Sequence, residues 1–369
     1  MYSQFDLVAG DGTRLTAWHN NSIYGPRVLV CNGMGVPPEA WPRLIADDCR
    51  YQVAGWNQRG VLGSDRPADP ARIEIEDHVG DAVALLDALN WPDAIVVAWS
   101  LGVNVAFELA NEHPDRVAGI LSVAGVPGGT FDTIFAPQLV PRPLRRPLGL
   151  GIVRTGRAFS SQLNMLSRVV PRGRPLAEAI RHSGIVLPIA DVKDVQPWTE
   201  TFFAQDWDWY FNLALALERH GRIDPSFIKV PVTIVAGAID ALTSMEDVLT
   251  YAREVQNSEV HVLASSHCVP LEHPDRIMTM LDGLVGRIEA HHAAQSYLAR
   301  WAEPSPDESD LVDLRSAEPT PLADVPPEAV AVVLDVRTEP AVADVRTKPA
   351  PHADGRTETA PENAPPAAP

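Results

Sequence analysis

Apolar residues in the first part of the chain form two kinds of segment that alternate. Short runs rich in Val, Ile and Leu predict buried strands, and they lie at residues 28–31, 51–56, 94–98 and 117–123. Apolar residues at helical spacing predict helices at residues 78–89 and 103–111. Strands that alternate with helices are typical of an α/β fold, in which a mostly parallel central sheet carries helices on both faces.

The same alternation resumes near the end of the folded part. Strands are expected at residues 232–236 and 260–263, and helices at residues 246–255 and from residue 275 onward. Because these segments continue the first pattern, we assign residues 1–126 and 223–300 to one core.

Residues 127–222 break the alternation and are rich in Pro, Arg and aromatic residues. Helices are expected near residues 177–181 and 207–219, so this segment is interpreted as a helical cap inserted between two strands. Its aromatic residues either line an apolar pocket or pack the cap onto the core, and packing is favoured for any single one. They are Trp198, Phe202, Phe203, Trp207, Trp209, Tyr210 and Phe211.

Residues 301–369 are dominated by Pro, Ala, Glu and Asp. A near-repeat begins at Asp335, Asp344 and Asp354, at a pitch too short for a solenoid unit. Such a composition cannot bury enough apolar surface to offset the entropy of ordering. We therefore expect a disordered tail. A solvated extension is favoured over a docking site for a protein partner.

Composition narrows the functional classes. The net charge of −18 argues against a nucleic-acid partner, which needs clustered Lys and Arg. Cys31, Cys49 and Cys268 show neither disulfide nor zinc spacing, which favours a reducing compartment. The N-terminus lacks the pattern of a secretory signal, and no stretch approaches the roughly 18 apolar residues of a membrane helix. We expect a cytoplasmic protein without an integral membrane segment.

The candidate nucleophile is Ser100, in residues 98–102 (A-W-S-L-G) between an apolar strand and a helical pattern. A serine on a sharp strand-to-helix turn presents its hydroxyl at the top of a sheet, and such a tight turn needs small residues on both sides. The usual form is G-x-S-x-G. Here Ala98 replaces the first glycine, and a methyl group usually fits.

The remaining chain supplies an acid and a base in the order that follows such a serine. Asp240 comes just past the strand at residues 232–236, and His267 just past the strand at residues 260–263. Both are therefore expected at the same sheet edge as Ser100. Each alone is more often a turn former or a surface residue, but both at strand ends after the Ser100 turn are hard to obtain by chance. His267 would act as general base and Asp240 would orient it.

Other residues are weaker candidates. His261 lies inside a strand, and His273 precedes Pro274 at the start of a helix. Cys268 beside His267 suggests a thiol mechanism but lacks the strand-to-helix turn, so a buried, inert cysteine is favoured.

The oxyanion that forms during attack on a carbonyl needs two backbone N–H donors. We expect one from Leu101, which follows the nucleophile. The second is assigned to Met34 in residues 32–35 (N-G-M-G), because the flanking glycines allow its N–H to turn into the site. This segment lacks the rest of a nucleotide-binding fingerprint. No metal cluster or phosphate loop is found either, so no cofactor is expected.

With these residues, the chain resembles the α/β-hydrolase superfamily over residues 1–300. Residues 56–67 (W-N-Q-R-G-V-L-G-S-D-R-P) are similar to the family's D-x-R-G-x-G-x-S-D-x-P stretch, with Asn57 in place of Asp and the second glycine displaced by one residue. Asn32 replaces the histidine of the common H-G-x-G loop. Residues 271–274 (L-E-H-P) resemble the family's pattern after the catalytic histidine. Within this family, dehalogenases and epoxide hydrolases carry an aspartate where Ser100 stands, so the resemblance implies a serine hydrolase.

The leading hypothesis is hydrolysis of a carboxylic ester, with an apolar small-molecule substrate, as in carboxylesterases and lipases. The same residues could act on a thioester or a C–C bond, or transfer an acyl group, because the pocket that distinguishes these substrates is not readable. A non-catalytic ligand-binding protein on this scaffold is the less favoured alternative, since no member of the Ser–Asp–His set is missing.

Overall fold

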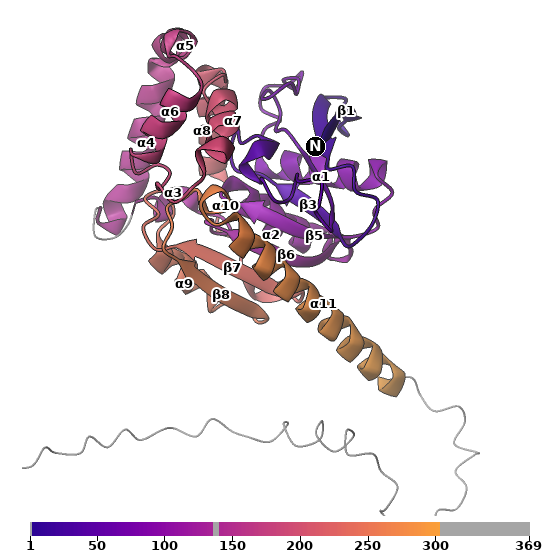
Figure 1. Cartoon of the computed structure of the whole chain (residues 1–369). Coiled ribbons are helices and arrows are strands. Elements are labelled where there is room, and N and C mark those ends of the chain that lie inside the picture. Colours follow the sequence, from indigo (N-terminus) through magenta and orange to yellow (C-terminus); the bar gives the residue numbers. More distant parts are fainter. Residues whose placement is uncertain (1, 136–139, 303–369) are drawn as a thin grey trace, which may run out of the picture. The chain divides into compact units, whose positions relative to one another are not determined.

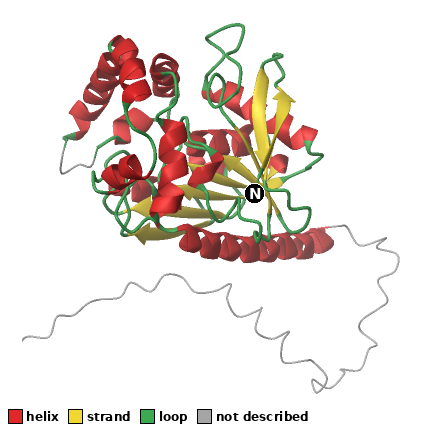
Figure 2. Cartoon of the chain, turned by 45° about the horizontal axis from the view of Figure 1, so that its top comes forward, coloured by secondary structure: helices red, strands yellow, loops and turns green. Residues whose placement is uncertain are grey.

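The computed structural model describes residues 2–135 and 140–302. Its centre is an eight-stranded sheet with the strand order β1-β2-β4-β3-β5-β6-β7-β8 (Figures 1 and 2). The strands are β1 (Ser3–Val8), β2 (Arg14–His19), β3 (Arg27–Cys31), β4 (Gln52–Trp56), β5 (Ala94–Trp99), β6 (Val117–Val123), β7 (Val232–Gly237) and β8 (Ser258–Leu263).

The sheet is parallel from β4 to β8 and antiparallel at its other side. β4, β3, β5, β6, β7 and β8 pair in parallel, whereas β1 pairs with β2 and β2 with β4 in antiparallel fashion. The carboxyl ends of the parallel strands therefore share one edge, which is where α/β folds place their ligands.

Helices cover both faces of the sheet. They are α1 (Ile75–Ala88), α2 (Leu101–Glu112), α9 (Met245–Ala252), α10 (Val269–Glu272) and α11 (Pro274–Ala302). Short 3-10 turns occur at η1 (Pro38–Ala40), η2 (Pro114–Arg116) and η3 (Pro225–Phe227).

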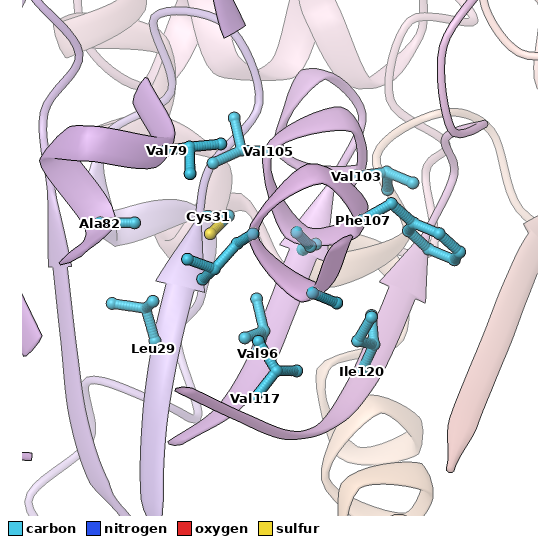
Figure 3. Packing of buried hydrophobic residues seen from close by; sticks show 14 of the residues in the cluster. Leu29, Cys31, Val79, Ala82, Val96, Val103, Val105, Phe107, Val117 and Ile120 are labelled. Atoms are coloured by element: carbon cyan, nitrogen blue, oxygen red, sulfur yellow. The ribbon is translucent and has the colours of Figure 1, made fainter. Parts of the chain in front are cut away.

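The buried parallel strands divide their side chains between two cores, because successive residues of a strand point to opposite faces. Val96 belongs to the core beneath α1, α2 and α9, and Val97 to the core beneath α11. Figure 3 shows the first of these, where Val103 and Phe107 of α2 lie over Val96 and Ile120 of the sheet. Packing in both cores fixes the positions of the carboxyl ends of these strands, and so fixes the geometry of the sheet edge that they share.

Among the described residues, six α-helices lie between β6 and β7, and we call them the β6–β7 insertion. They are α3 (Thr130–Thr133), α4 (Arg142–Ala158), α5 (Ser160–Val169), α6 (Arg174–Arg181), α7 (Val192–Phe202) and α8 (Trp207–Arg219). α4, α5 and α6 lie on the opposite side of the molecule from the far end of α11 (Figure 1). Among the described residues, no helix is long and apolar enough to cross a membrane.

The expected α/β architecture is confirmed, and most expected elements differ from the observed ones only at their ends. The strand at residues 117–123 and the helix at residues 207–219 have the expected bounds. α1 begins at Ile75, three residues before the expected residue 78, because Glu74 and Asp77 form a reciprocal capping box. α9 ends at Ala252, so the expectation that it continues to residue 255 was wrong.

Several elements were not expected from the sequence. β1 and β2 were missed, as were α4, α5 and α7. α4 contains Pro143, Pro147 and several glycines, which argue against a helix when read locally. Pro143 lies in the first turn, where its missing N–H costs no hydrogen bond. The expected tail at residues 301–369 lies outside the described residues, apart from the end of α11.

Candidate active site

Ser100 lies on a sharp turn between β5 and α2. Its backbone has φ 55° and ψ −116°, a conformation that is strained for a residue with a side chain. A Cβ at Gly102 would lie 1.8 Å from the carbonyl oxygen of Cys31, so only glycine fits there. Ala98, which replaces the usual glycine, is fully buried within β5, and the structure accommodates its methyl group there. The turn that the sequence predicted is therefore present at the carboxyl edge of the sheet.

His267 and Asp240 lie beside Ser100 and form a hydrogen-bonded chain with it. The Nε2 atom of His267 lies 2.9 Å from Ser100 Oγ, and its Nδ1 atom lies 2.8 Å from Asp240 Oδ2. Asp240 follows β7 and His267 follows β8, and these strands are neighbours in the sheet. All three residues singled out from the sequence thus meet at one edge.

Hydrogen-bond partners determine the orientation of Asp240 and the tautomer of His267. Asp240 is buried, and its Oδ1 accepts the backbone N–H groups of Leu242 at 2.7 Å and Thr243 at 2.9 Å. The ionised carboxylate can only accept, so Nδ1 of His267 carries the proton. Nε2 is then the acceptor for the Ser100 hydroxyl, which is the arrangement that general-base catalysis requires.

A buried carboxylate holds the loop that carries His267. Glu272 of α10 accepts hydrogen bonds from Ser265 Oγ at 2.6 Å, from Ser266 N at 2.9 Å and from Ser266 Oγ. It also accepts Leu187 N of the β6–β7 insertion at 2.8 Å. The Trp99 indole N–H donates to the carbonyl oxygen of His267 at 2.9 Å. The histidine backbone is therefore fixed from both sides.

The loop after β3 lies against the Ser100 turn. A Cβ placed on Gly33 would lie 3.5 Å from Ser100 Cβ. Asn32, which replaces the usual histidine, accepts the Trp41 indole N–H at 2.5 Å and donates to the carbonyl oxygen of Val36 at 3.2 Å. Asn32 thus has a structural role in closing this loop.

Two glutamines hold the same loop from outside. Gln58 Oε1 accepts Gly35 N at 2.9 Å, and its Nε2 donates to the carbonyl oxygens of Asn32 at 3.2 Å and Gly33 at 3.3 Å. Gln205, between α7 and α8, donates from Nε2 to Gly35 O at 3.0 Å. Both glutamines are buried. The conformation of the loop therefore depends on the core and on the β6–β7 insertion together.

The two expected oxyanion donors lie on these fixed segments. Leu101 is the first residue of α2, where backbone N–H groups lack partners within the helix. Met34 lies between Gly33 and Gly35, and its side chain packs against buried residues of the core. Their role as donors stays a prediction.

The aromatic residues of the insertion pack mainly against one another. Phe202 is at the centre, with its ring centroid 5.5 Å from that of Trp198, 5.8 Å from Trp207 and 5.7 Å from Tyr210. Burial raises the pKa of Tyr210 to about 12. Trp209 faces the core instead, where its indole N–H donates to the carbonyl oxygen of Arg59 at 2.7 Å. Packing is confirmed for Trp198 and Trp209, which are both buried. A pocket lined by the others stays a prediction.

The weaker candidates do not take part in this chain of hydrogen bonds. Cys268 is buried, as expected, and burial raises the pKa of its thiol. That it is inert stays a prediction. His261 pairs with Glu259, 2.9 Å away, and His273 lies 3.3 Å from the carbonyl oxygen of Ala264. Within residues 2–135 and 140–302, no group of three His, Cys, Asp or Glu side chains could hold a metal ion.

Glu272, Gln58 and Gln205 were not singled out from the sequence. Glu272 and Gln58 lie in the stretches at residues 271–274 and 56–67 that resemble the family, so a signal for them existed. No local pattern marks Gln205, because its partner Gly35 is brought to it only by the docking of the insertion.

Several known proteins with similar sequences are hydrolases. Residues 26–274 match the model of the alpha/beta hydrolase fold family. A 3-oxoadipate enol-lactonase of Acinetobacter baylyi is 23% identical over 265 residues, which are 71% of this chain and 89% of that protein. An epoxide hydrolase of Mycobacterium tuberculosis is 32% identical over 138 residues, and a putative carbamate hydrolase of Caulobacter segnis is 33% identical over 99 residues. The match to the epoxide hydrolase covers 32% of this chain, and the match to the carbamate hydrolase covers 27%. Each match spans 37% of the relative's own length.

Solved structures show the same fold. The enol-lactonase of Burkholderia xenovorans superposes with a TM-score of 0.58 at 19% identity, over 76% of this chain and all of that one. An esterase of Exiguobacterium antarcticum gives a TM-score of 0.59 at 15% identity, over 76% of this chain and 99% of that one. Together with the family match over residues 26–274, this places the chain in the alpha/beta hydrolase fold family.

Proposed function

We propose that the protein is a serine hydrolase that cleaves a carboxylic ester through an acyl-enzyme on Ser100. The observation that carries this proposal is the hydrogen-bonded chain from Ser100 Oγ through His267 to Asp240, with distances of 2.9 and 2.8 Å. A serine at this turn also supports an esterase over an epoxide hydrolase, in which we expect an aspartate.

The mechanism follows from the positions of the atoms. His267 Nε2 takes the Ser100 proton as Oγ attacks the ester carbonyl. The N–H groups of Met34 and Leu101 stabilise the oxyanion, and Asp240 stabilises the imidazolium. His267 then donates its proton to the leaving alcohol. A water molecule, deprotonated by His267, finally releases the acid from Ser100.

The β6–β7 insertion is proposed to act as the cap over this site, with residues 127–222 forming the cap. Gln205 supports this role because it connects the insertion to the Gly33–Gly35 loop. The three free cysteines, all buried, are consistent with the proposal that the enzyme works in the cytoplasm.

A lactone is a second candidate substrate. The relative from Acinetobacter baylyi, which matches over 71% of this chain, is an enol-lactonase. A lactone is a cyclic ester, so the same attack by Ser100 would open its ring, and the alcohol would stay attached to the acyl group. Thioester cleavage, C–C bond cleavage and acyl transfer remain alternatives for the same three residues.

The test compares wild type with Ser100→Ala on p-nitrophenyl esters from acetate to palmitate, and on simple lactones followed by pH-stat titration. Loss of the nucleophile should lower kcat/KM by at least about a thousandfold. Ser161→Ala, at an exposed position in α5, is the matched control and should keep full activity. Activity in Ser100→Ala equal to wild type would rule out the proposal. Labelling of Ser100 by a fluorophosphonate without ester turnover would direct the search to thioesters and C–C substrates.

A further inference from the structure

The outer helices of the β6–β7 insertion carry a charge opposite to that of the chain. Residues 133–177 contain no Asp or Glu, whereas the chain as a whole has a net charge of −18. The same stretch contains eight arginines: Arg142, Arg145, Arg146, Arg154, Arg157, Arg168, Arg172 and Arg174. This concentration of positive charge is independent of the proposed hydrolase site.

Part of this charge remains unpaired. Arg142 and Arg145 pair with Asp247, and Arg146 pairs with Glu218. Arg154 and Arg168 are exposed and have no ion-pair partner among the described residues. Arg172, also exposed, donates to the carbonyl oxygen of Ser167 and has no ion-pair partner within residues 2–135 and 140–302. Three guanidinium groups therefore remain available to an anionic partner.

Exposed apolar side chains lie on α4 and α5, the helices that carry Arg154 and Arg168. In α4, Leu144, Leu148 and Ile152 are 56%, 45% and 52% exposed and follow one another at four-residue spacing, so they share one face. Phe159, at the end of α4, continues the same face and is also exposed. Met165, Leu166 and Val169 of α5 are likewise exposed. We call these apolar and arginine side chains the α4–α5 surface.

These helices contribute little to the interior. The buried residues of α4 are Arg145 and Gly149, and those of α5 are Ser160 and Ser167. None of the three clusters of buried apolar residues includes a residue of either helix. The exposed apolar residues of α4 and α5 are therefore not explained by packing within the described residues.

From this combination we infer that the α4–α5 surface docks onto an anionic phospholipid bilayer. Helices with leucine, isoleucine and phenylalanine on one face and arginine beside them bind in the plane of a membrane interface, with their apolar side chains among the acyl chains. The unpaired arginines would meet the lipid phosphates. A symmetric pair of chains is disfavoured as the occupant, because it would bring two arginine-rich surfaces together.

The test is co-sedimentation of the full chain with vesicles of phosphatidylcholine alone or with phosphatidylglycerol added. We expect binding to the anionic vesicles that weakens as salt is raised. Leu148→Glu with Ile152→Glu should lower the partition coefficient at least about tenfold. Arg154→Glu with Arg168→Glu should lower it by about tenfold or more on anionic vesicles only. Circular dichroism checks that each variant is folded.

The matched control is Ile23→Glu with Tyr24→Glu, which removes two exposed apolar residues from the loop between β2 and β3. It should bind vesicles like wild type. Three results would overturn the inference: no binding by wild type, equal loss in the control pair, or self-association of wild type that Leu148→Glu with Ile152→Glu abolishes. The third result would identify a second copy of the chain as the occupant.

Discussion

The carboxyl edge of the sheet and the outer helices of the β6–β7 insertion are built in opposite ways. At the sheet edge, Asp240, Glu272 and Gln58 are buried, and each makes several hydrogen bonds to backbone or side-chain groups. In α4 and α5, several apolar side chains and the arginines Arg154 and Arg168 are exposed. The difference indicates that the role of the sheet edge depends on the exact positions of its atoms, whereas the role of α4 and α5 depends on which kinds of side chain they expose. Substitutions at the sheet edge should therefore change activity, and substitutions of exposed residues on α4 should leave it unchanged.

The largest effect is expected from Asp240→Asn. Asp240 Oδ1 accepts two backbone N–H groups, so the amide oxygen of the asparagine would stay there and its NH2 group would face Nδ1 of His267. His267 would then carry its proton on Nε2, the wrong tautomer for a base, and kcat should fall by about 10³ to 10⁴ at neutral pH. The measurement is steady-state hydrolysis of the best p-nitrophenyl ester. Asp115→Asn, at an exposed position in η2, is the control and should be unaffected. A loss below about tenfold would mean that Asp240 does not orient the base.

The next effect is expected from Gln58→Ala. This change removes the acceptor for Gly35 N–H and both bonds to the carbonyl oxygens of Asn32 and Gly33. If the loop presents an oxyanion donor, kcat should fall by about a hundredfold while KM changes little.

Gln205→Ala removes a single bond from the insertion to Gly35, so its effect on kcat should be smaller, about tenfold. Together the two variants measure how much of the loop geometry comes from the core and how much from the insertion. An equal loss in both, or a change in KM alone, would contradict this division.

Glu272→Gln should affect stability more than chemistry. The glutamine keeps one acceptor oxygen, and its NH2 group would face a backbone group that itself donates, either Ser266 N or Leu187 N. Burying such mismatched donors should cost about 2 kcal/mol of unfolding free energy. Urea denaturation measures this cost, with Glu112→Gln at the exposed end of α2 as control. Unchanged stability would show that Glu272 does not anchor the histidine loop.

The smallest effect is expected from Arg154→Ala on α4. Because Arg154 is exposed and without an ion-pair partner among the described residues, unfolding free energy should change by less than about 0.5 kcal/mol. Hydrolysis of a water-soluble ester should stay the same. A loss of activity comparable to that of Gln205→Ala would remove the contrast between the two regions.

Local patterns predicted β5, β6 and β7 because each is a continuous apolar run that is buried on both faces. The β1–β2 hairpin was missed because β1 is largely exposed, and its register is set by pairing such as Leu7 with Leu15. The helices α4 and α7 were missed because Pro147 and Pro197 lie inside them. Tertiary contacts can stabilise such helices, and local helix propensity does not report those contacts.

By itself, the sequence determined the α/β alternation and the order of Ser100, Asp240 and His267, each at the end of an apolar strand. That was possible because parallel strands bring their carboxyl ends to one edge whatever the details of packing. Only the tertiary structure decided how the site is held, through Glu272, Gln58 and Gln205, and which residues of the insertion face outward. Those contacts join segments far apart in the chain, and no local pattern of residues encodes which distant backbone groups a buried side chain will meet.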